Sequence, residues 1–126
     1  MKKEYRQLTN LERHILDRLL SREFPGRDKL GQQISSGLVR IINEYKDNWG
    51  SLEFNISSNV KASVTSRIPV QGILNDSDGV PIQIFLHVVN GKVDELEIVK
   101  ADNSPLKSPI DPKKIRVVTD QEVVRD

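Results

Sequence analysis

The sequence predicts an α+β fold in which two N-terminal helices pack on one face of an antiparallel sheet of about four to six strands. Apolar residues recur with helical spacing before residue 36, and from Leu38 onward they alternate with polar residues. A run of helices followed by a run of strands is typical of α+β domains. With 126 residues, two halves would each be too small to bury an adequate core. We therefore predict a single domain over residues 1–126.

The first predicted helix covers residues 10–22. Thr9 and Glu12 stand three residues apart as a capping box, in which each side chain accepts a hydrogen bond from a backbone N–H at the helix start. Projection at 100° per residue gives this helix one apolar side. That side comprises Leu11, Ile15, Leu16, Leu19 and Leu20. Pro25 and Gly26 then favour a turn, because proline disfavours helical geometry in the residue before it.

The second predicted helix covers residues 27–35. Leu30 and Ile34 lie four residues apart on its apolar side, and Asp28 complements the positive end of the helix dipole. Gly37 supplies a stop signal after the helix.

The strands are predicted from two-residue alternation and from turn residues between the alternating segments. They fall at about 38–45, 51–57, 67–74, 81–88 and 92–100, with a short strand at about 115–118. Pro69 favours an edge, a bulge or the start of its strand. The segment 102–112 contains three of the six prolines and is predicted to form a loop.

The length of the turn in the hairpin 85–102 follows from matching its faces. A two-residue Asn90-Gly91 turn would pair Ile84 with Glu97 and put carboxylates on the apolar face. A three-residue loop, 89–91, instead pairs Ile84 with Leu96. We therefore predict the longer loop, with its glycine in the left-handed conformation.

Two helices can cover only one face of such a sheet, so the other face is expected to meet solvent or a partner. The predicted outward side chains are Glu53, Asn55, Gln83, Phe85, His87, Glu95 and Glu97.

Composition narrows the possible functions. Nineteen basic against eighteen acidic residues give a net charge of +1, so no global field attracts nucleic acid. The absence of cysteine excludes disulfides and thiol catalysis. The N-terminus has no apolar segment of the signal-peptide type, and no run approaches the ~18 apolar residues that indicate a membrane span. We expect a cytoplasmic protein.

No motif predicts a metal or a cofactor. Asp76, Asp78 and Gly79 follow the order of a calcium loop, but Phe85 stands where the bidentate glutamate belongs, so a tight turn is the better interpretation. His14 lies on another element than His87, without the paired spacing of a zinc site.

Enzymatic and nucleic-acid functions are not favoured. His87 shares a face with Glu95 and Glu97, which permits acid–base chemistry, but no nucleophile, base and oxyanion set accompanies them. The basic candidates are sparse and interleaved with acidic residues. They are Arg13, Arg18 and Arg22 on the first helix, and Lys107, Lys113, Lys114 and Arg116 near the C-terminus.

Protein binding fits the pattern better. An acidic sheet face with one aromatic residue and one histidine suits a basic partner. The candidate interface consists of Glu53, Phe85, His87, Asp94, Glu95 and Glu97. A merely hydrophilic, solvated face is the structural alternative.

Two stretches also resemble a known group of proteins. Leu8–Leu30, with the sequence LTNLERHILDRLLSREFPGRDKL, and Leu86–Asp102, with the sequence LHVVNGKVDELEIVKAD, resemble a family of small uncharacterised bacterial proteins. Some of these look like immunity proteins of contact-dependent growth inhibition and related polymorphic toxin systems. The shared motifs are a capped helix and a hairpin, so they carry over no functional residue.

The resemblance implies a cytoplasmic protein that binds and neutralises one cognate toxin domain, often a nuclease. The near-neutral charge departs from the strongly acidic inhibitors expected against basic nucleases, although a local acidic patch serves the same end. The alternative is a small bacterial domain with a ligand-binding or enzymatic role.

Overall fold

The computed structural model describes residues 4–42 and 49–122. Across these residues the chain forms two α-helices and a six-stranded antiparallel sheet, which confirms the predicted α+β fold. The helices are α1 (Asn10–Leu19) and α2 (Arg27–Ser36), and a 3-10 turn, η1 (Pro112–Lys114), precedes the last strand. The strands are β1 (Leu38–Ile41), β2 (Leu52–Asn55), β3 (Val70–Asn75), β4 (Pro81–Val89), β5 (Lys92–Lys100) and β6 (Arg116–Thr119).

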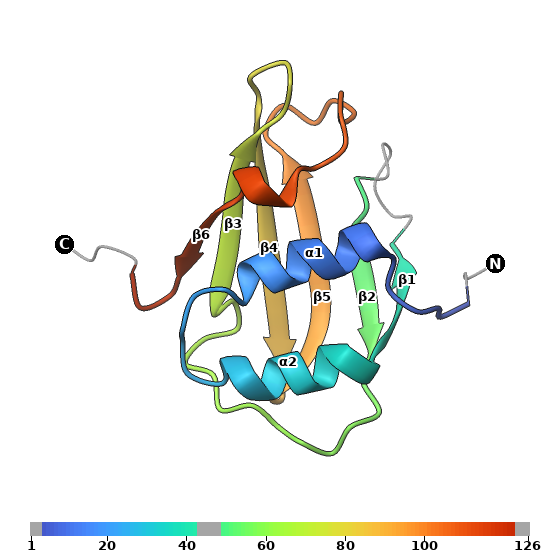
Figure 1. Ribbon diagram of the computed structural model, residues 1–126, viewed down its shortest axis with the longest axis vertical. Helices are drawn as coiled ribbons and strands as arrows, with labels where there is room; N and C mark the ends of the chain where they lie inside the picture. Colours follow the sequence, from blue (N-terminus) through green and yellow to red (C-terminus); the bar gives the residue numbers. More distant parts are fainter. Residues whose placement is uncertain (1–3, 43–48, 123–126) are drawn as a thin grey trace.

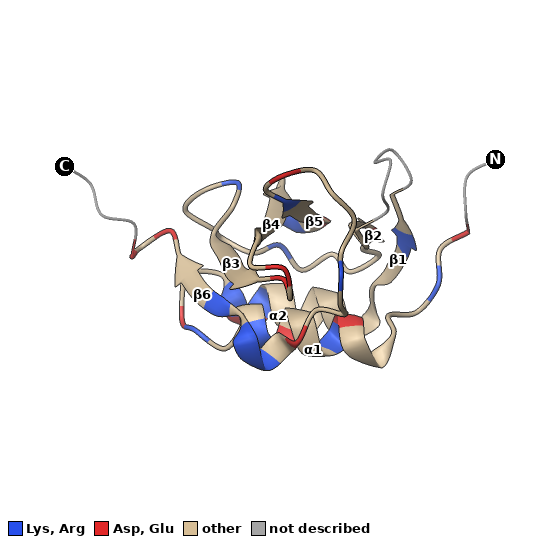
Figure 2. Ribbon diagram, turned by 90° about the horizontal axis from the view of Figure 1, so that it is seen from above, with Lys and Arg blue, Asp and Glu red and all other residues tan. Residues whose placement is uncertain are grey.

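The sheet has the strand order β1-β2-β5-β4-β3-β6. Both helices cross the same face of it (Figure 1). Seen from above, the opposite face carries no helix (Figure 2). Neither helix of the described part of the chain has the length and apolar character needed to cross a bilayer.

The predicted capping box is present at the start of α1. The Glu12 N–H donates to Thr9 Oγ1 over 3.1 Å, and the Thr9 N–H donates to Glu12 Oε1 over 2.9 Å. The predicted end at residue 22 is wrong, because α1 stops at Leu19. Both the N–H and the hydroxyl of Ser21 bond to the Arg18 carbonyl and close a turn there.

The core lies between the two helices and the inner sheet face. Ile15, Leu16 and Leu19 are buried as predicted, whereas Leu11 is 42% exposed and lies outside the core. Gly72 of β3 allows close packing of the two layers, because a Cβ there would lie only 3.1 Å from Leu19 Cδ2 of α1 and 2.5 Å from Ile115 Cγ2. A larger residue at this position would separate the helix layer from the sheet.

Several strand boundaries differ from the prediction. β3 starts at Val70 rather than residue 67, because Pro69 has no N–H to give to the sheet; β3 is an inner strand, so the proline marks its start and not a sheet edge. β2 is shorter than predicted at both ends, and β6 begins at Arg116, one residue later than predicted. β1 ends at Ile41, and the rest of its predicted extent falls partly outside the described residues.

The predicted three-residue loop between β4 and β5 is wrong. Val89 pairs with Lys92 around a two-residue turn, in which Asn90 (φ 52°) and Gly91 (φ 75°) are both left-handed. A β-bulge follows, since Val88 pairs with Val93 but His87 pairs with Glu95. This extra residue restores the alternation that the shorter turn alone would have inverted. Ile84 consequently pairs with Ile98, two residues beyond the predicted partner.

Side chains and the N-terminal segment occupy both edges of the sheet. On the free edge of β6, Arg18 Nε donates to the Ile115 carbonyl over 3.0 Å and Arg22 donates to the Val117 carbonyl over 3.3 Å. At the other edge, Arg6 and Val39 of β1 exchange two backbone hydrogen bonds of 2.7 and 2.8 Å. These groups are therefore already bonded and do not offer a ready template for another strand.

Candidate functional site

The six side chains of the predicted interface come together on the sheet face that the helices leave uncovered. Register places Glu53 of β2 directly opposite Glu95 of β5, and Glu95 opposite His87 of β4. Phe85 pairs in the same way with Glu97. Glu53, Phe85, His87, Asp94, Glu95 and Glu97 are called the outer-face cluster below. All six are at least partly exposed, and for all but Asp94 this fits the outward orientation predicted from alternation.

His87 is the centre of the hydrogen bonding in this cluster. Its Nε2 lies 2.8 Å from Glu97 Oε1, and its Nδ1 accepts a longer bond of 3.3 Å from Arg67 Nε. The His87 side chain is 14% exposed and that of Glu97 is 27% exposed. Arg67 stands in the segment before β3, and no pattern in the sequence associates it with His87. The imidazole therefore has a partner at both nitrogens.

Two residues on the β1 side of Glu53, Tyr5 and Arg40, hold its carboxylate. Tyr5 donates its hydroxyl to Glu53 Oε2 over 2.5 Å, and Arg40 of β1 donates to the same oxygen over 2.6 Å. The Arg40 guanidinium also lies 4.5 Å from the centre of the Tyr5 ring, within cation–π range. The hydrogen bond to the carboxylate raises the pKa of Tyr5, and partial burial adds to the effect.

The ligand-bearing atoms of His87, Glu95 and Glu97 lie within 4.8 Å of one another. Glu95 has Glu53 on one side and His87 on the other in the strand pairing. Carboxylates placed directly opposite each other on a sheet destabilise it. The Arg40 guanidinium, which donates to Glu53, offsets part of this repulsion.

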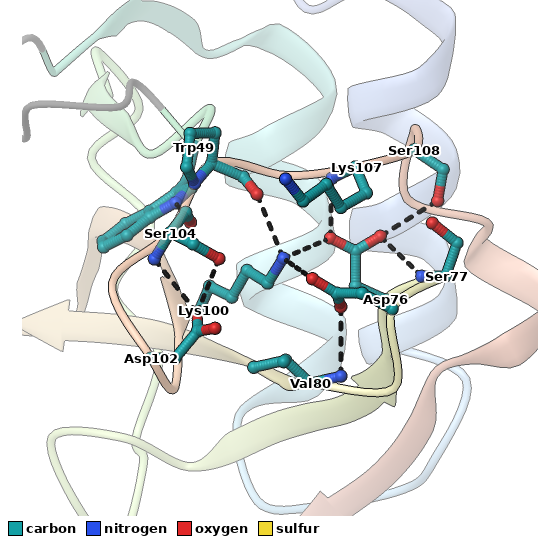
Figure 3. A network of polar contacts seen from close by, with 11 residues as sticks. Trp49, Asp76, Ser77, Val80, Lys100, Asp102, Ser104, Lys107 and Ser108 are labelled. Carbon is teal, nitrogen blue, oxygen red and sulfur yellow. Dashed lines mark hydrogen bonds and ion pairs between the residues drawn. The ribbon is translucent and has the colours of Figure 1, made fainter.

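A second polar network surrounds a buried lysine. The side chain of Lys100, at the end of β5, is fully buried and points to the inner side of the sheet, opposite Ile82. Its ammonium donates to Asp76 Oδ2 over 2.9 Å, to Asp78 Oδ2 over 2.7 Å and to the Pro105 carbonyl over 3.0 Å (Figure 3). The apparent calcium motif is therefore a turn whose carboxylates bind an internal ammonium.

The network shifts the protonation of its members. Asp76 accepts the Lys107 N–H, the Lys100 ammonium, the Ser77 N–H and the Ser108 hydroxyl, and these hydrogen bonds hold its pKa well below the usual range. The Lys100 hydrogen bond likewise lowers the pKa of Asp78.

Burial alone would lower the pKa of Lys100, but its hydrogen bonds to Asp78 and Asp76 outweigh burial and raise it. The shifted groups thus bond to one another within the fold, and the network fastens the loop after β5 to the β3–β4 turn. Trp49 adds a further attachment by donating its indole N–H to the Ser104 carbonyl over 2.9 Å.

The basic candidates do not form one surface. Arg18 and Arg22 bond to backbone carbonyls beside β6, as described above. His14, Asp17 and Arg18 line an open hollow of about 450 Å³ with Asp111, Pro112 and Lys113, between α1 and η1. Acidic and basic residues alternate around it, so the hollow has no single charge.

Comparison with known proteins assigns a family. The model of a family described as a domain of unknown function, DUF6984, matches residues 5–110. The chain belongs to this family. No curated protein and no solved structure matches the chain.

The DUF6984 match covers both helices and the strands β1 to β5, and it ends before η1 and β6. The whole outer-face cluster and the Lys100 network lie within it. The description of the family assigns no activity.

Proposed function

We propose that this DUF6984 protein is a toxin-neutralising immunity protein that binds a basic surface of its cognate toxin domain with the outer-face cluster. The observation that carries the proposal is that the carboxylates Glu53, Glu95 and Glu97 gather on a sheet face without a helix. Cationic side chains of a partner would pair with these carboxylates, beside the ion pair that Arg40 already makes with Glu53, and such complementary charges give specificity.

The arrangement also suits tight binding because its side chains are already positioned. Arg40 and Tyr5 hold Glu53, and the hydrogen bond to Glu97 holds His87. Strand-borne, hydrogen-bonded side chains lose little conformational entropy on association. Docking on the face rather than by strand addition agrees with the bonded groups at both sheet edges.

The partner in this proposal is a toxin domain with nuclease activity, and the site of action is the bacterial cytoplasm. Acidic groups can block a nuclease by occupying its nucleic-acid surface, and a local patch provides them despite the net charge of +1. The proposal involves no catalytic group and no cofactor.

The test uses the toxin domain encoded beside this gene. We expect the chain to restore growth of cells that express this domain and to bind it 1:1 in titration calorimetry. Glu95→Lys and Glu97→Lys should each weaken binding by about tenfold or more, as for a charge reversed within an interface. Glu23→Lys is the matched control, because Glu23 lies between the helices and its side chain is 91% exposed.

Two results would overturn the proposal. A neighbourhood of metabolic genes without any secreted protein that has a variable C-terminal domain would remove the toxin. Unchanged affinity in both Glu95→Lys and Glu97→Lys would remove the outer-face cluster from the interface.

A further inference from the structure

We propose that His87, Glu95 and Glu97 form a binding site for a divalent transition-metal ion of the zinc class. The three donor atoms lie within 4.8 Å of one another, and they come from the paired strands β4 and β5. One imidazole with two carboxylates is a donor set that suits borderline divalent ions such as Zn²⁺. The inference does not depend on the toxin partner.

The spacing of the donors needs little change to accept an ion. Ligands at ~2.1 Å from a tetrahedral centre lie about 3.4 Å apart. The His87 Nε2 to Glu97 Oε1 distance is 2.8 Å, so a metal would replace the present hydrogen bond by moving the two atoms slightly apart. Glu95 then approaches by rotation about its side-chain bonds, while the strands hold all three Cα positions.

The surroundings set the number of protein ligands at three. Glu53 faces Glu95 across the sheet, but its Oε2 already accepts hydrogen bonds from Tyr5 and Arg40. The side chains of His87 and Glu97 are 14% and 27% exposed, so solvent reaches the site. Water or a donor from another molecule would complete the coordination, as in sites that keep an open position. A bound dication would also offset the repulsion between Glu53 and Glu95.

Arg67 opposes metal binding at this site. A neutral imidazole has one N–H and one free lone pair, and Arg67 Nε donates to Nδ1, so the proton lies on Nε2. Binding a metal through Nε2 moves that proton to Nδ1, where it would face the N–H of Arg67. Since Arg67 is exposed, it can swing away, but the guanidinium charge and the lost hydrogen bond reduce the affinity. A residue that accepts a hydrogen bond from Nδ1–H should raise the affinity, as second-shell acceptors do for metal-bound histidine.

The experiment titrates the chelator-treated, tag-free full chain with Zn²⁺ by calorimetry and with Co²⁺ by visible absorption. We expect one ion per chain, with micromolar affinity for Zn²⁺, and cobalt d–d bands that Zn²⁺ removes. His87→Ala, Glu95→Gln and Glu97→Gln should each weaken binding by about tenfold or more. Circular dichroism establishes that each variant is folded, and His14→Ala is the matched control because the chain has only two histidines.

The diagnostic variant is Arg67→Gln. Its amide oxygen can accept the Nδ1 proton, so we expect this variant to bind Zn²⁺ several-fold more tightly than the unmodified chain, an outcome that a plain His87–Glu97 hydrogen bond does not predict. The proposal is overturned if millimolar Zn²⁺ does not bind, if folded His87→Ala binds as well as the original chain, or if His14→Ala abolishes binding. Weaker binding by Arg67→Gln would overturn the role given to Arg67. If the chain binds the toxin domain but not Zn²⁺, the metal site is refuted and the proposed function is not. If it binds Zn²⁺ but not the toxin domain, the proposed function is refuted and the metal site is not.

Discussion

Replacing Gln33 by methionine tests how α2 is attached to the sheet. Gln33 is fully buried. Its Nε2 donates to the carbonyls of Val60 and Gly91, both over 2.8 Å, and its Oε1 accepts the Val93 N–H over 2.9 Å. This one side chain therefore joins the helix, the β4–β5 turn and the segment before β3. Methionine has a similar size and shape but makes none of these hydrogen bonds.

The cost follows from which backbone groups lose their partners. The Gly91 carbonyl keeps a second donor, the Ala62 N–H at 2.9 Å, and Val60 is 37% exposed, so water can replace its bond. The N–H of Val93 is left without a partner in a residue that is only 3% exposed. An unsatisfied buried donor costs about 1–3 kcal/mol, and each lost hydrogen bond adds about 0.5–1.5 kcal/mol. We therefore expect Gln33→Met to lower the free energy of unfolding by about 2–4 kcal/mol.

Urea unfolding, followed by the fluorescence of Trp49 and by far-ultraviolet circular dichroism, measures this change. With an m-value of about 2 kcal/mol/M, the midpoint should fall by about 1–2 M. Gln32→Met makes the same replacement at the exposed neighbouring position and should change stability by less than about 0.5 kcal/mol. If the two variants unfold at the same urea concentration, the reasoning about the Val93 N–H is refuted.

Three further changes test other parts of the fold. Lys100→Met should lower the urea midpoint at pH 7 and flatten its acid dependence. Because folding lowers the pKa of Asp76, this carboxylate stabilises the fold at pH values above its ordinary pKa of ~3.9, and the stabilisation is lost as the pH falls towards the folded-state pKa. Midpoint curves of the variant and the original chain that run parallel from pH 7 to pH 3 would contradict this. Gly72→Ala should lower the free energy of unfolding by about 1–3 kcal/mol, because the new Cβ would lie 2.5 Å from the nearest side chain. Gly31→Ala in α2 leaves 3.8 Å to the nearest side chain and should raise the free energy of unfolding by up to about 1 kcal/mol. Thermal midpoints of the two variants that move in the same direction would be inconsistent with this packing. Thr9→Ala should remove the capping box and cost about 1 kcal/mol, measured by urea unfolding, and an unchanged midpoint would show that the cap is dispensable.

The outward and inward faces of the strands were predictable because successive side chains of a strand point to opposite faces, whichever strand is the partner. The pairing of β4 with β5 was not, since the two-residue turn and the bulge each shift the register by one residue relative to the predicted loop. Together they keep the alternation and move every partner by two residues. Ile84 therefore faces Ile98 instead of Leu96, although both pairings look equally apolar in the sequence. The outer-face cluster, apart from Asp94, could be listed as outward residues even though the predicted turn was wrong.

Contacts between distant segments left no signal in the sequence. Lys100 ends a strand where a lysine is usually solvated, and its carboxylate partners stand 24 and 22 residues earlier in what reads as an ordinary turn. Arg67 meets His87 across 20 residues, and Tyr5 meets Glu53 across 48 residues. Such pairs depend on how the segments are arranged in space, which the local sequence pattern does not determine.

The bulge at Asp94 also changes how densely charge can be placed on the sheet. A regular strand shows only every second side chain on a given face. In the chain as it is, the bulge is needed to keep the alternation, but a chain without Asp94 would pair His87 with Glu95 and Leu86 with Leu96 in an unbroken ladder. The pairing therefore gives no reason for this residue. Its presence instead gives one face two consecutive acidic residues, Asp94 and Glu95, with Glu97 next on the same side. Three carboxylates thereby occupy four residues of a single strand, a linear charge density that a regular pleat does not provide.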